Sequence, residues 1–273
     1  MEFIFKRSYN GKVKSVIFDW AGTTVDFGCF APAGNFVDVF KKYNVDITIE
    51  EARIPMGLHK RDHIREITKM TRINNEWFIK NGKYVSEDDV NNMFADFIPR
   101  QLELLPNFTD LIPNTAEVVD HLRVLGLKIG STTGYNNEMM EIVTKAAKQQ
   151  GYETDCLVCA SDVPAGRPAP WMIFKNAMML DVYPLNSIVK VGDTISDIEE
   201  GLNANVWSVG IVEPSNEMGM RLEDVINCDP KLLEKRKNEV RKKFLSAGAH
   251  FVIDTIEELP ALIEKINYRL SNF

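Results

Sequence analysis

The chain has 273 residues and a formal net charge of −7, with 45% hydrophobic and 26% charged residues. These fractions are ordinary for a globular protein and exclude a disordered or fibrous chain. The length fits about two domains or one large α/β barrel, and the negative charge disfavours nucleic acids and anionic membranes as partners.

Residues 13–19 are the first recognisable element, an apolar run that ends in Asp19 and predicts a buried strand with a turn after it at 22–24. Farther along, Phe36, Val37, Phe40 and Tyr43 recur at helical spacing. More helices are expected near 62–70, 74–80 and 88–105. Because no strand is expected between residues 29 and 105, this part is predicted to be a helical insert.

Strands alternate with helices after residue 107. Asn114 and Glu117 have the spacing of a capping box at a helix start, and Gly126 stands where that helix is expected to end. Strands are expected over 127–131, 156–159, 187–191, 207–212 and 250–253, with helices over 137–150, 170–180, 195–204, 229–247 and from 255 onward. This alternation predicts a parallel sheet that is covered on both faces and binds its ligand at the carboxyl ends of the strands.

The predicted fold class is therefore α/β, with a doubly wound, Rossmann-like parallel sheet and an inserted all-helical domain. We expect the core domain to comprise residues 1–27 and 106–273, and the insert to comprise residues 28–105. An interrupted core of this kind accounts for the length better than two consecutive domains or a barrel.

The four cysteines are too sparse for a disulfide scaffold. Residues 1–7 are too short an apolar run for a signal peptide, and no stretch approaches the roughly 18 apolar residues of a membrane span. We therefore expect a cytoplasmic protein.

Polar side chains stand at the predicted strand ends. Asp19 ends the first strand, Thr133 the second, and Asp193 with Asp197 follows a later one. Carboxylates from two strand ends can hold Mg²⁺, and a carboxylate can attack phosphorus. The Thr133 hydroxyl and the Arg167 guanidinium suit the oxygens of a phosphoryl group.

These motifs resemble those of the haloacid dehalogenase-like superfamily of phosphotransferases, over nearly the whole chain. In that superfamily an Asp nucleophile, a Thr or Ser, a Lys or Arg and a pair of acids follow one another, which matches Asp19, Thr133, Arg167 and Asp193 with Asp197. The resemblance implies that the insert is a helical cap.

Ala21 departs from the superfamily pattern. Phosphatases of the superfamily carry a second Asp two residues after the nucleophile, which protonates the leaving oxygen of a phosphate ester. The Ala21 side chain cannot donate a proton, although its carbonyl can still bind Mg²⁺. Either the enzyme is a poor phosphatase, or its leaving group needs no such acid.

Lys60 suggests a leaving group that needs no acid at position 21. A neutral lysine can form an imine with a carbonyl substrate. With a reference pKa of about 10.4, only about one lysine in two thousand is neutral at pH 7. Burial and a cationic neighbour such as Arg61 would lower that pKa.

Within the superfamily, the chain resembles the phosphonoacetaldehyde hydrolase family. The matching stretches are residues 19–24, 28–32, 55–57 with Lys60 and His63, 130–135, 162–168 and 191–194. The resemblance implies hydrolysis of the carbon–phosphorus bond of phosphonoacetaldehyde, through a lysine imine and an aspartyl-phosphate, to acetaldehyde and phosphate. An enamine leaves through carbon, so no bridging oxygen needs the acid that Ala21 lacks.

The same resemblance implies the roles of individual residues. Asp19 is the nucleophile and Lys60 forms the imine. Mg²⁺ lies on Asp19, Asp193 and the Ala21 carbonyl, while Asp197 holds the metal's waters or orients other groups. A homodimer formed through the cap is also implied.

The other site residues are expected to surround the substrate. Thr133 and Arg167 bind the phosphoryl oxygens, while Met56 and His63 line the lysine pocket, His63 as a candidate proton relay. Three further positions that match the family are expected to bind the substrate, namely Cys29, Gly134 and Tyr135, and the resemblance gives no firm role to Cys29 or Tyr135.

Two other functions stay open. A phosphatase or phosphomutase acting on a small phosphate ester is the first alternative, against which Ala21 argues. A non-catalytic regulatory member of the superfamily is the second, against which the complete set of motifs argues.

Several patterns are interpreted as structural. His59 and His63 have helical metal spacing, but the HExxH pattern is incomplete and zinc is disfavoured. Cys156 and Cys159 are expected to be buried thiols on opposite faces of a strand. Residues 139–140 and 178–179, all methionines, are expected in the core, and the basic stretch 231–244 is expected to be a solvated helix face. Residues 214–228 suggest no function.

Overall fold

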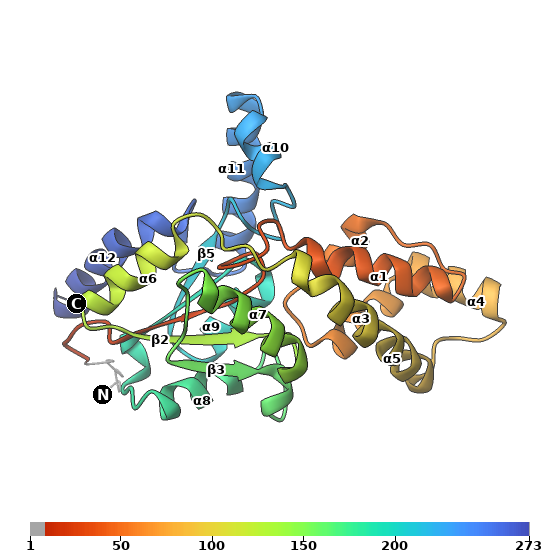
Figure 1. Cartoon of the computed structure of the whole chain (residues 1–273), viewed down its shortest axis with the longest axis horizontal. Coiled ribbons are helices and arrows are strands. Elements are labelled where there is room, and N and C mark those ends of the chain that lie inside the picture. Colours follow the sequence, from red (N-terminus) through yellow and green to blue (C-terminus); the bar gives the residue numbers. More distant parts are fainter. Residues whose placement is uncertain (1–8, 273) are drawn as a thin grey trace, which may run out of the picture.

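A six-stranded parallel sheet forms the centre of the protein, in a computed structural model that describes residues 9–272 (Figure 1). The strands are β1 (Ser15–Phe18), β2 (Lys128–Thr133), β3 (Cys156–Cys159), β4 (Ile188–Gly192), β5 (Trp207–Ile211) and β6 (Phe251–Ile253). Their order is β3-β2-β1-β4-β5-β6, and each neighbouring pair is parallel. This is the doubly wound order, so the predicted fold class is confirmed.

Helices cover both faces of the sheet. Alternate strand residues point in opposite directions, and apolar side chains on both faces have to be buried. Val16 and Phe18 of β1 belong to one apolar cluster, and Ile17 belongs to another. The first face carries α6 (Thr115–Val124), α7 (Asn137–Gln149) and α12 (Leu259–Asn272). The other carries α8 (Trp171–Met179), α9 (Ile195–Asn203) and α11 (Pro230–Ser246).

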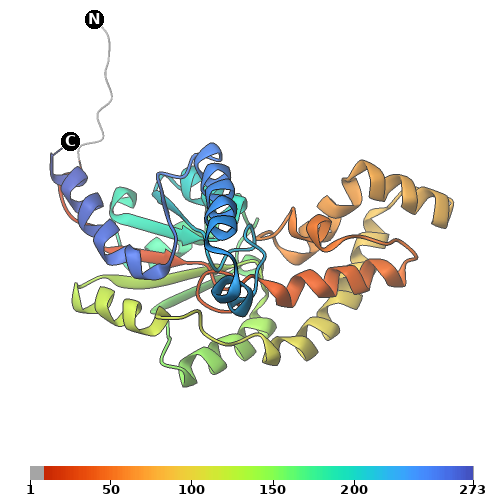
Figure 2. The ribbon, with the colours of Figure 1, turned by 90° about the horizontal axis from the view of Figure 1, so that it is seen from above.

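Five helices between β1 and α6 lie beside the sheet rather than on it, as both views show (Figures 1 and 2). They are α1 (Phe30–Lys42), α2 (Ile49–Arg53), α3 (Lys60–Lys69), α4 (Thr71–Asn81) and α5 (Glu87–Leu104). No strand interrupts them, as predicted for the insert. Phe36 and Phe97, with ring centroids 4.6 Å apart, join α1 to α5 in its core.

Shorter elements complete the chain. They are α10 (Leu222–Asn227) and the four 3₁₀ turns η1 (Leu105–Asn107), η2 (Ala160–Asp162), η3 (Leu185–Ser187) and η4 (Ile256–Glu258). Neither α2 nor α10 was predicted from the sequence. Both are only one or two turns long, so neither offers enough periodicity to be recognised.

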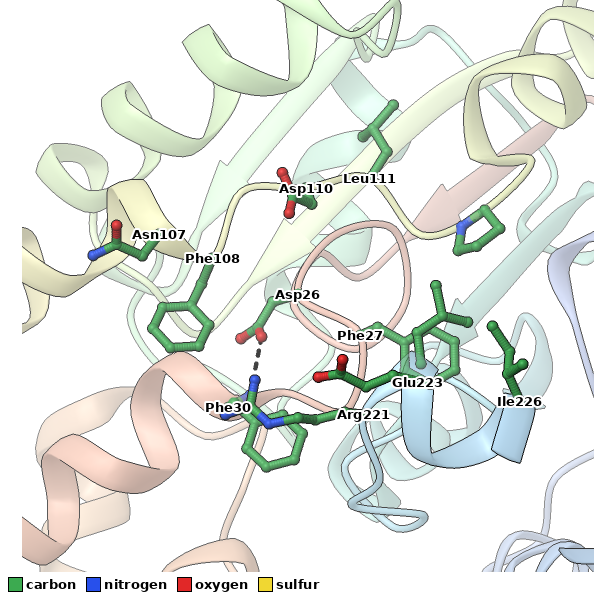
Figure 3. Close-up of a pocket in the computed structure, with 12 residues that line it drawn as sticks. Asp26, Phe27, Phe30, Asn107, Phe108, Asp110, Leu111, Arg221, Glu223 and Ile226 are labelled. Carbon is green, nitrogen blue, oxygen red and sulfur yellow. Dashed lines mark hydrogen bonds between the residues drawn. The ribbon is translucent and has the colours of Figure 1, made fainter. Parts of the chain in front are cut away.

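The connections between the insert and the sheet run side by side. A surface pocket of about 350 Å³ lies where they meet α10, and both Asp26 of the first connection and Asp110 of the second line it (Figure 3). Asp26 accepts hydrogen bonds from the backbone N–H groups of Phe30 and Ala31 at 3.0 and 2.9 Å, which caps the start of α1. Burial raises the pKa of Asp26 to about 6.

Several sequence predictions are corrected by the structure. Asn114 has a φ of +65° and its side chain caps nothing, so the predicted capping box at α6 is wrong. Gly126, at φ +83°, does follow the end of that helix. Met139 and Met140 are buried as expected, whereas the prediction for residues 178–179 is wrong, since Met178 and Met179 are 75% and 61% exposed.

Other predictions are confirmed. Cys156 and Cys159 are buried free thiols that belong to different apolar clusters on the two faces. In α11, Val240 and Phe244 are buried while most of its basic residues face solvent. None of the helices described in residues 9–272 combines the length and the apolar character that crossing a membrane requires. The prediction for residues 1–7 lies outside the described residues.

Candidate active site

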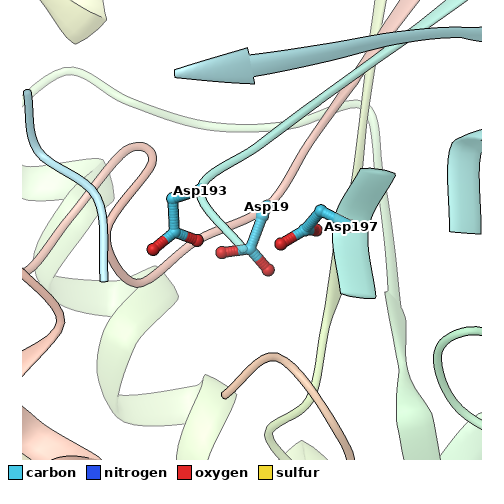
Figure 4. Close-up of side chains that lie close together, drawn as sticks. All are labelled: Asp19, Asp193 and Asp197. Atoms are coloured by element: carbon cyan, nitrogen blue, oxygen red, sulfur yellow. The ribbon is translucent and has the colours of Figure 1, made fainter. Parts of the chain in front are cut away.

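Three buried carboxylates meet at the carboxyl ends of β1 and β4 (Figure 4). Asp19 directly follows β1, and its N–H donates to the Val191 carbonyl of β4 at 2.9 Å. Asp193 follows β4, and Asp197 stands one turn into α9. Because these two strands are neighbours, one oxygen from each of the three side chains lies within 4.8 Å of the others.

Gly22 allows the loop after Asp19 to approach the second strand end. Its φ is +89°, and a Cβ there would lie 2.1 Å from Asp193 Oδ2. No other residue type fits this position without moving Asp193. The loop brings Ala21 to the rim of the same cavity as Asp19 and Asp193.

Burial and mutual repulsion set the charges of these acids. Burial raises the pKa of Asp19 to about 6, although the Arg167 guanidinium acts in the opposite direction. Burial, with the negative charges of Asp19 and Asp197, raises the pKa of Asp193 well above its usual value. A bound cation would relieve this repulsion, so the donor set fits a hard metal ion with oxygen ligands.

Asp197 differs from the other two acids because a buried lysine and a hydroxyl group bind its two oxygens at short distances. Lys190 Nζ lies 2.7 Å from Oδ1, and the Thr194 hydroxyl donates to Oδ2 at 2.6 Å. Burial raises the pKa of Asp197, but Arg167 and Lys190 outweigh that effect and hold it below its usual value. Asp193, by contrast, accepts one close hydrogen bond at Oδ2, from the Asn216 N–H at 2.8 Å, and only a long one at Oδ1, from the Thr23 hydroxyl at 3.4 Å. Asp197 is therefore less free than Asp193 to bind a metal directly.

Arg167 connects the acids through a buried fork of donors. Its Nη2 lies 2.7 Å from Asp19 Oδ1 and 3.1 Å from Asp197 Oδ1, and it donates to the Thr132 carbonyl at 3.0 Å. Its Nε donates to Glu200 at 2.9 Å. The guanidinium is thus fixed beside Asp19, where an incoming phosphoryl group would need a cation.

Lys60 reaches the same cavity from the helical insert. It is the first residue of α3 and is 4% exposed, with its Nζ 4.9 Å from the centroid of the Tyr135 ring. Burial lowers the pKa of Lys60. The adjacent Arg61, a candidate for the same effect, binds Glu87 at 2.7 Å on the surface instead. Burial and not Arg61 is therefore the main cause.

Met56 and His63 flank Lys60. Lys60 Nζ lies 4.0 Å from the Met56 sulfur. His63 Nε2 lies 2.8 Å from the Ala52 carbonyl, and its ring stacks on Phe36 at 3.8 Å between centroids. Burial lowers the pKa of His63 well below its usual value, with Lys60 adding to the effect. His63 therefore presents a neutral ring to the lysine pocket.

The remaining candidates line the cavity between the two parts of the protein. Thr133 ends β2, and its hydroxyl accepts a hydrogen bond from the Tyr135 N–H at 3.1 Å. Gly134 lets the insert approach, since a Cβ there would lie 2.5 Å from the Leu58 carbonyl oxygen. Burial raises the pKa of both Cys29 and Tyr135 well above their usual values, so both keep their protons.

One small cavity thus gathers most of the residues predicted from the sequence. Its lining includes Asp19, Ala21, Cys29, Met56, Lys60, Thr133, Gly134, Tyr135, Arg167 and Asp193. Asp197 and His63 stand behind this lining rather than in it. The cavity measures about 20 Å³, room for about one water molecule. The structure is therefore a closed arrangement of the insert against the sheet.

Two buried charged residues of the site were missed in the sequence. Lys190 lies within β4 and binds Asp197, while Glu200 lies in α9 and binds both Arg167 and, at 3.3 Å, the Thr132 hydroxyl. A lysine inside an apolar strand was the available signal, because such a residue needs a buried acid as its partner. Glu200 gave no comparable signal.

Replacing Glu200 by Gln tests this supporting network. We expect the free energy of unfolding to fall by about 2 kcal/mol, because Arg167 loses a charge-assisted hydrogen bond in a dry environment. Urea denaturation measures it. Glu199→Gln is the matched control, since Glu199 is the exposed neighbour in α9 and should change stability by less than about 0.5 kcal/mol. Equal effects of the two variants would contradict the assignment.

Comparisons with known proteins agree with this geometry. Residues 13–205 match the haloacid dehalogenase-like hydrolase family. A phosphonoacetaldehyde hydrolase of Bacillus cytotoxicus is 52% identical over 255 residues, which cover 93% of this chain and 97% of the relative. A bifunctional phosphonoacetaldehyde hydrolase/aminoethylphosphonate transaminase of Clostridioides difficile is 52% identical over 261 residues, but the match spans only 41% of that longer protein.

A solved structure matches the whole fold. The crystal structure of a phosphonoacetaldehyde hydrolase-like protein from Oleispira antarctica superimposes with a TM-score of 0.95 at 38% identity. The match covers 99% of this chain and 98% of that one. The sheet and the helical insert are therefore shared in the same relative arrangement.

Proposed function

The chain belongs to the haloacid dehalogenase-like hydrolases and, within them, to the phosphonoacetaldehyde hydrolase family, and from this premise we propose that it hydrolyses phosphonoacetaldehyde to acetaldehyde and phosphate. The observation that carries the proposal is the meeting of Lys60 and Asp19 in one closed cavity that also contains Ala21. An amine for the aldehyde and a carboxylate for the phosphorus then lie at opposite ends of one small substrate.

The reaction starts at Lys60. Its neutral amine adds to the aldehyde and loses water, which gives an imine that becomes protonated. An Asp19 oxygen then attacks phosphorus, and the carbon–phosphorus bonding pair moves into the protonated imine to form an enamine. Burial supports the first step, because it lowers the pKa of Lys60 and so increases the neutral fraction.

The later steps restore the enzyme. The enamine takes up a proton at carbon, one water hydrolyses the resulting imine to acetaldehyde, and another hydrolyses the aspartyl-phosphate to phosphate. We assign His63 to the proton transfers near Lys60, with Met56 shaping the pocket. Support for His63 comes from its neutral ring and from an Nδ1 that has no hydrogen-bond partner among the described residues.

Ala21 fits this leaving group. An enamine departs through carbon, so no acid has to protonate an ester oxygen, and a methyl group suffices at that position. The same residue argues against a phosphatase or phosphomutase acting on an ester. We assign Thr133 and Arg167 to the phosphonyl oxygens, and Cys29, Gly134 and Tyr135 to the walls of the pocket.

We propose Mg²⁺ as the metal. Asp19, Asp193 and the Ala21 carbonyl would hold it, and Asp197 would orient the groups around it. Bound there, Mg²⁺ would offset the repulsion between Asp19 and the anionic phosphonyl group. Support comes from the three clustered carboxylates. Burial and the negative charges of Asp19 and Asp197 raise the pKa of Asp193, and a bound cation would offset this repulsion.

The organisation of the molecule completes the proposal. We assign residues 28–105 to the cap, and residues 1–27 and 106–273 to the core. A cavity of about 20 Å³ cannot admit the substrate, so the cap must open between turnovers.

A homodimer through the cap is supported by exposed apolar side chains on α4 and just after it, among them Ile79 and Tyr84. Sedimentation of the purified chain tests it. Free cysteines support a reducing, cytoplasmic location.

Phosphate release tests the function. With Mg²⁺, phosphonoacetaldehyde should be cleaved at least about a hundredfold faster, by kcat/KM, than any member of a panel of small phosphate esters, because the esters cannot form an imine. Removing the metal with EDTA should abolish turnover, and adding Mg²⁺ back should restore it. Faster release from an ester would favour the phosphatase alternative, and no turnover of either class would favour a non-catalytic role.

A further inference from the structure

The loop between β5 and α10 is packed against the hinge of the cap. The Gly28 N–H donates to the Pro214 carbonyl at 2.8 Å, and Arg53 of α2 donates to the Gly28 carbonyl at 2.7 Å. This loop belongs to residues 214–228, for which the sequence suggested no function. It therefore contacts the cap directly at Gly28, and Arg53, which binds Gly28, also contacts Asn216 of this loop.

Asn216 binds Arg53 in both directions. Arg53 Nη1 donates to Asn216 Oδ1 at 3.0 Å and to the Asn216 backbone carbonyl at 3.3 Å, while Asn216 Nδ2 donates to the Arg53 carbonyl at 3.2 Å. The asparagine is 3% exposed. Among the ion pairs found in residues 9–272 none involves Arg53. Its close contacts are these carbonyl oxygens and the Phe30 ring, 4.8 Å from its guanidinium carbon, and its charge also acts on the buried Asp26.

Asn216 also touches the candidate metal site. Its backbone N–H donates to Asp193 Oδ2 at 2.8 Å. One residue of the core thus binds the cap through its side chain and a metal-binding carboxylate through its backbone. Two further contacts between cap and core are of another kind. Ser196 and Arg167 donate to the backbone carbonyls of Met56 and Gly57, and neither of these contacts involves Asp193.

We propose that Asn216 is a positioning residue that couples seating of the cap to the orientation of Asp193. When the cap is seated, Arg53 fixes the Asn216 side chain, and the loop then holds its N–H on Asp193 Oδ2. When the cap lifts, Arg53 leaves with α2 and the loop is free to shift. The expected effect on phosphate release from phosphonoacetaldehyde rests on the proposed function, whereas the expected effect on Mg²⁺ binding does not.

A double-mutant cycle with Asn216→Ala and Arg53→Met tests the coupling. Neither side chain lines the active-site cavity, so the catalytic groups stay intact. Each single variant should weaken Mg²⁺ binding, measured by calorimetry with the metal alone, by about tenfold, and should lower kcat/KM for phosphate release similarly. The double variant should lose no more than either single variant, because both break the same contact.

Asn227→Ala is the matched control. Asn227 is an exposed asparagine of α10 whose side chain donates within its own helix, to the Glu223 carbonyl at 2.7 Å. It should leave Mg²⁺ affinity and kcat/KM unchanged. Arg53→Met keeps the proposal testable if Asn216→Ala does not fold, since it changes the cap side of the same contact.

Different results would contradict the coupling through Asn216 and the proposed function. Unchanged Mg²⁺ affinity in both single variants, or losses that add up in the double variant, would overturn the coupling and leave Asn216 with a structural role. A wild-type chain that binds Mg²⁺ but releases no phosphate from phosphonoacetaldehyde would overturn the proposed function instead. In that case the calorimetric cycle would still decide the role of Asn216.

Discussion

Lys60→Arg is expected to abolish the borohydride-trapped adduct with phosphonoacetaldehyde and to lower phosphate release by at least about 10⁴-fold. Arginine keeps the positive charge near the phosphonyl group but offers no neutral amine to the aldehyde. Without an imine, cleavage of the carbon–phosphorus bond would expel a poorly stabilised carbanion. Mass spectrometry of the reduced wild-type protein should locate the adduct on Lys60.

The environment of Lys60 gives this experiment a pH dependence. Burial lowers its pKa, so the neutral amine should appear at a lower pH than in an exposed lysine. Lys80, exposed on α4, is the matched residue, and Lys80→Arg should leave trapping and turnover intact. Trapping or turnover that survives in Lys60→Arg would exclude the imine mechanism.

The parts of the site that the sequence revealed are those tied to strand ends. Asp19 and Asp193 follow apolar runs, and a doubly wound sheet places the carboxyl ends of such strands at one edge. Arg167 and Lys60 were proposed from their side-chain chemistry, and resemblance joined them in one site, because nothing in their local pattern requires them to converge. Arg167 meets Asp19 within the core, whereas Lys60 reaches them only through the closed position of the insert, which no local spacing encodes.

Other residues could not be predicted because their roles depend on tertiary neighbours. Glu200 has the same chemistry as Glu199, yet one is buried against Arg167 and the other faces solvent. Met178 and Met179 have the composition of Met139 and Met140 but stand on the outward side of α8. Helical spacing identifies a helix face, and only the packed structure decides whether anything covers it.

Two asparagines near the connections between cap and core show the same limit of prediction from local sequence. Asn114 has the right type and spacing for a capping box, but it adopts a left-handed conformation and its side chain makes no capping hydrogen bond. Asn216 lies in a loop without periodicity and gains its contacts from α2 and from Asp193. Such contacts join segments that are far apart in the chain, so local pattern reasoning cannot find them.

Asp19→Asn is expected to separate the two halves of the reaction. Phosphate release should fall by at least about 10⁴-fold, because an amide oxygen is a poor nucleophile toward phosphorus. Borohydride trapping at Lys60 should persist, since the imine forms without Asp19. The negative charge of Asp19 raises the pKa of Lys60, so its removal should increase the neutral amine fraction rather than reduce it.

Two measurements on each of three proteins decide the roles of Asp19 and Lys60. Phosphate release and the mass of the reduced adduct are followed in wild type, in Asp19→Asn and in Asp38→Asn, whose acid is exposed on α1 and should affect neither readout. Residual phosphate release near the wild-type rate would place the nucleophile elsewhere. Loss of trapping in a folded Asp19→Asn protein would mean that imine formation needs the carboxylate, and that Lys60 and Asp19 act as one unit rather than in sequence.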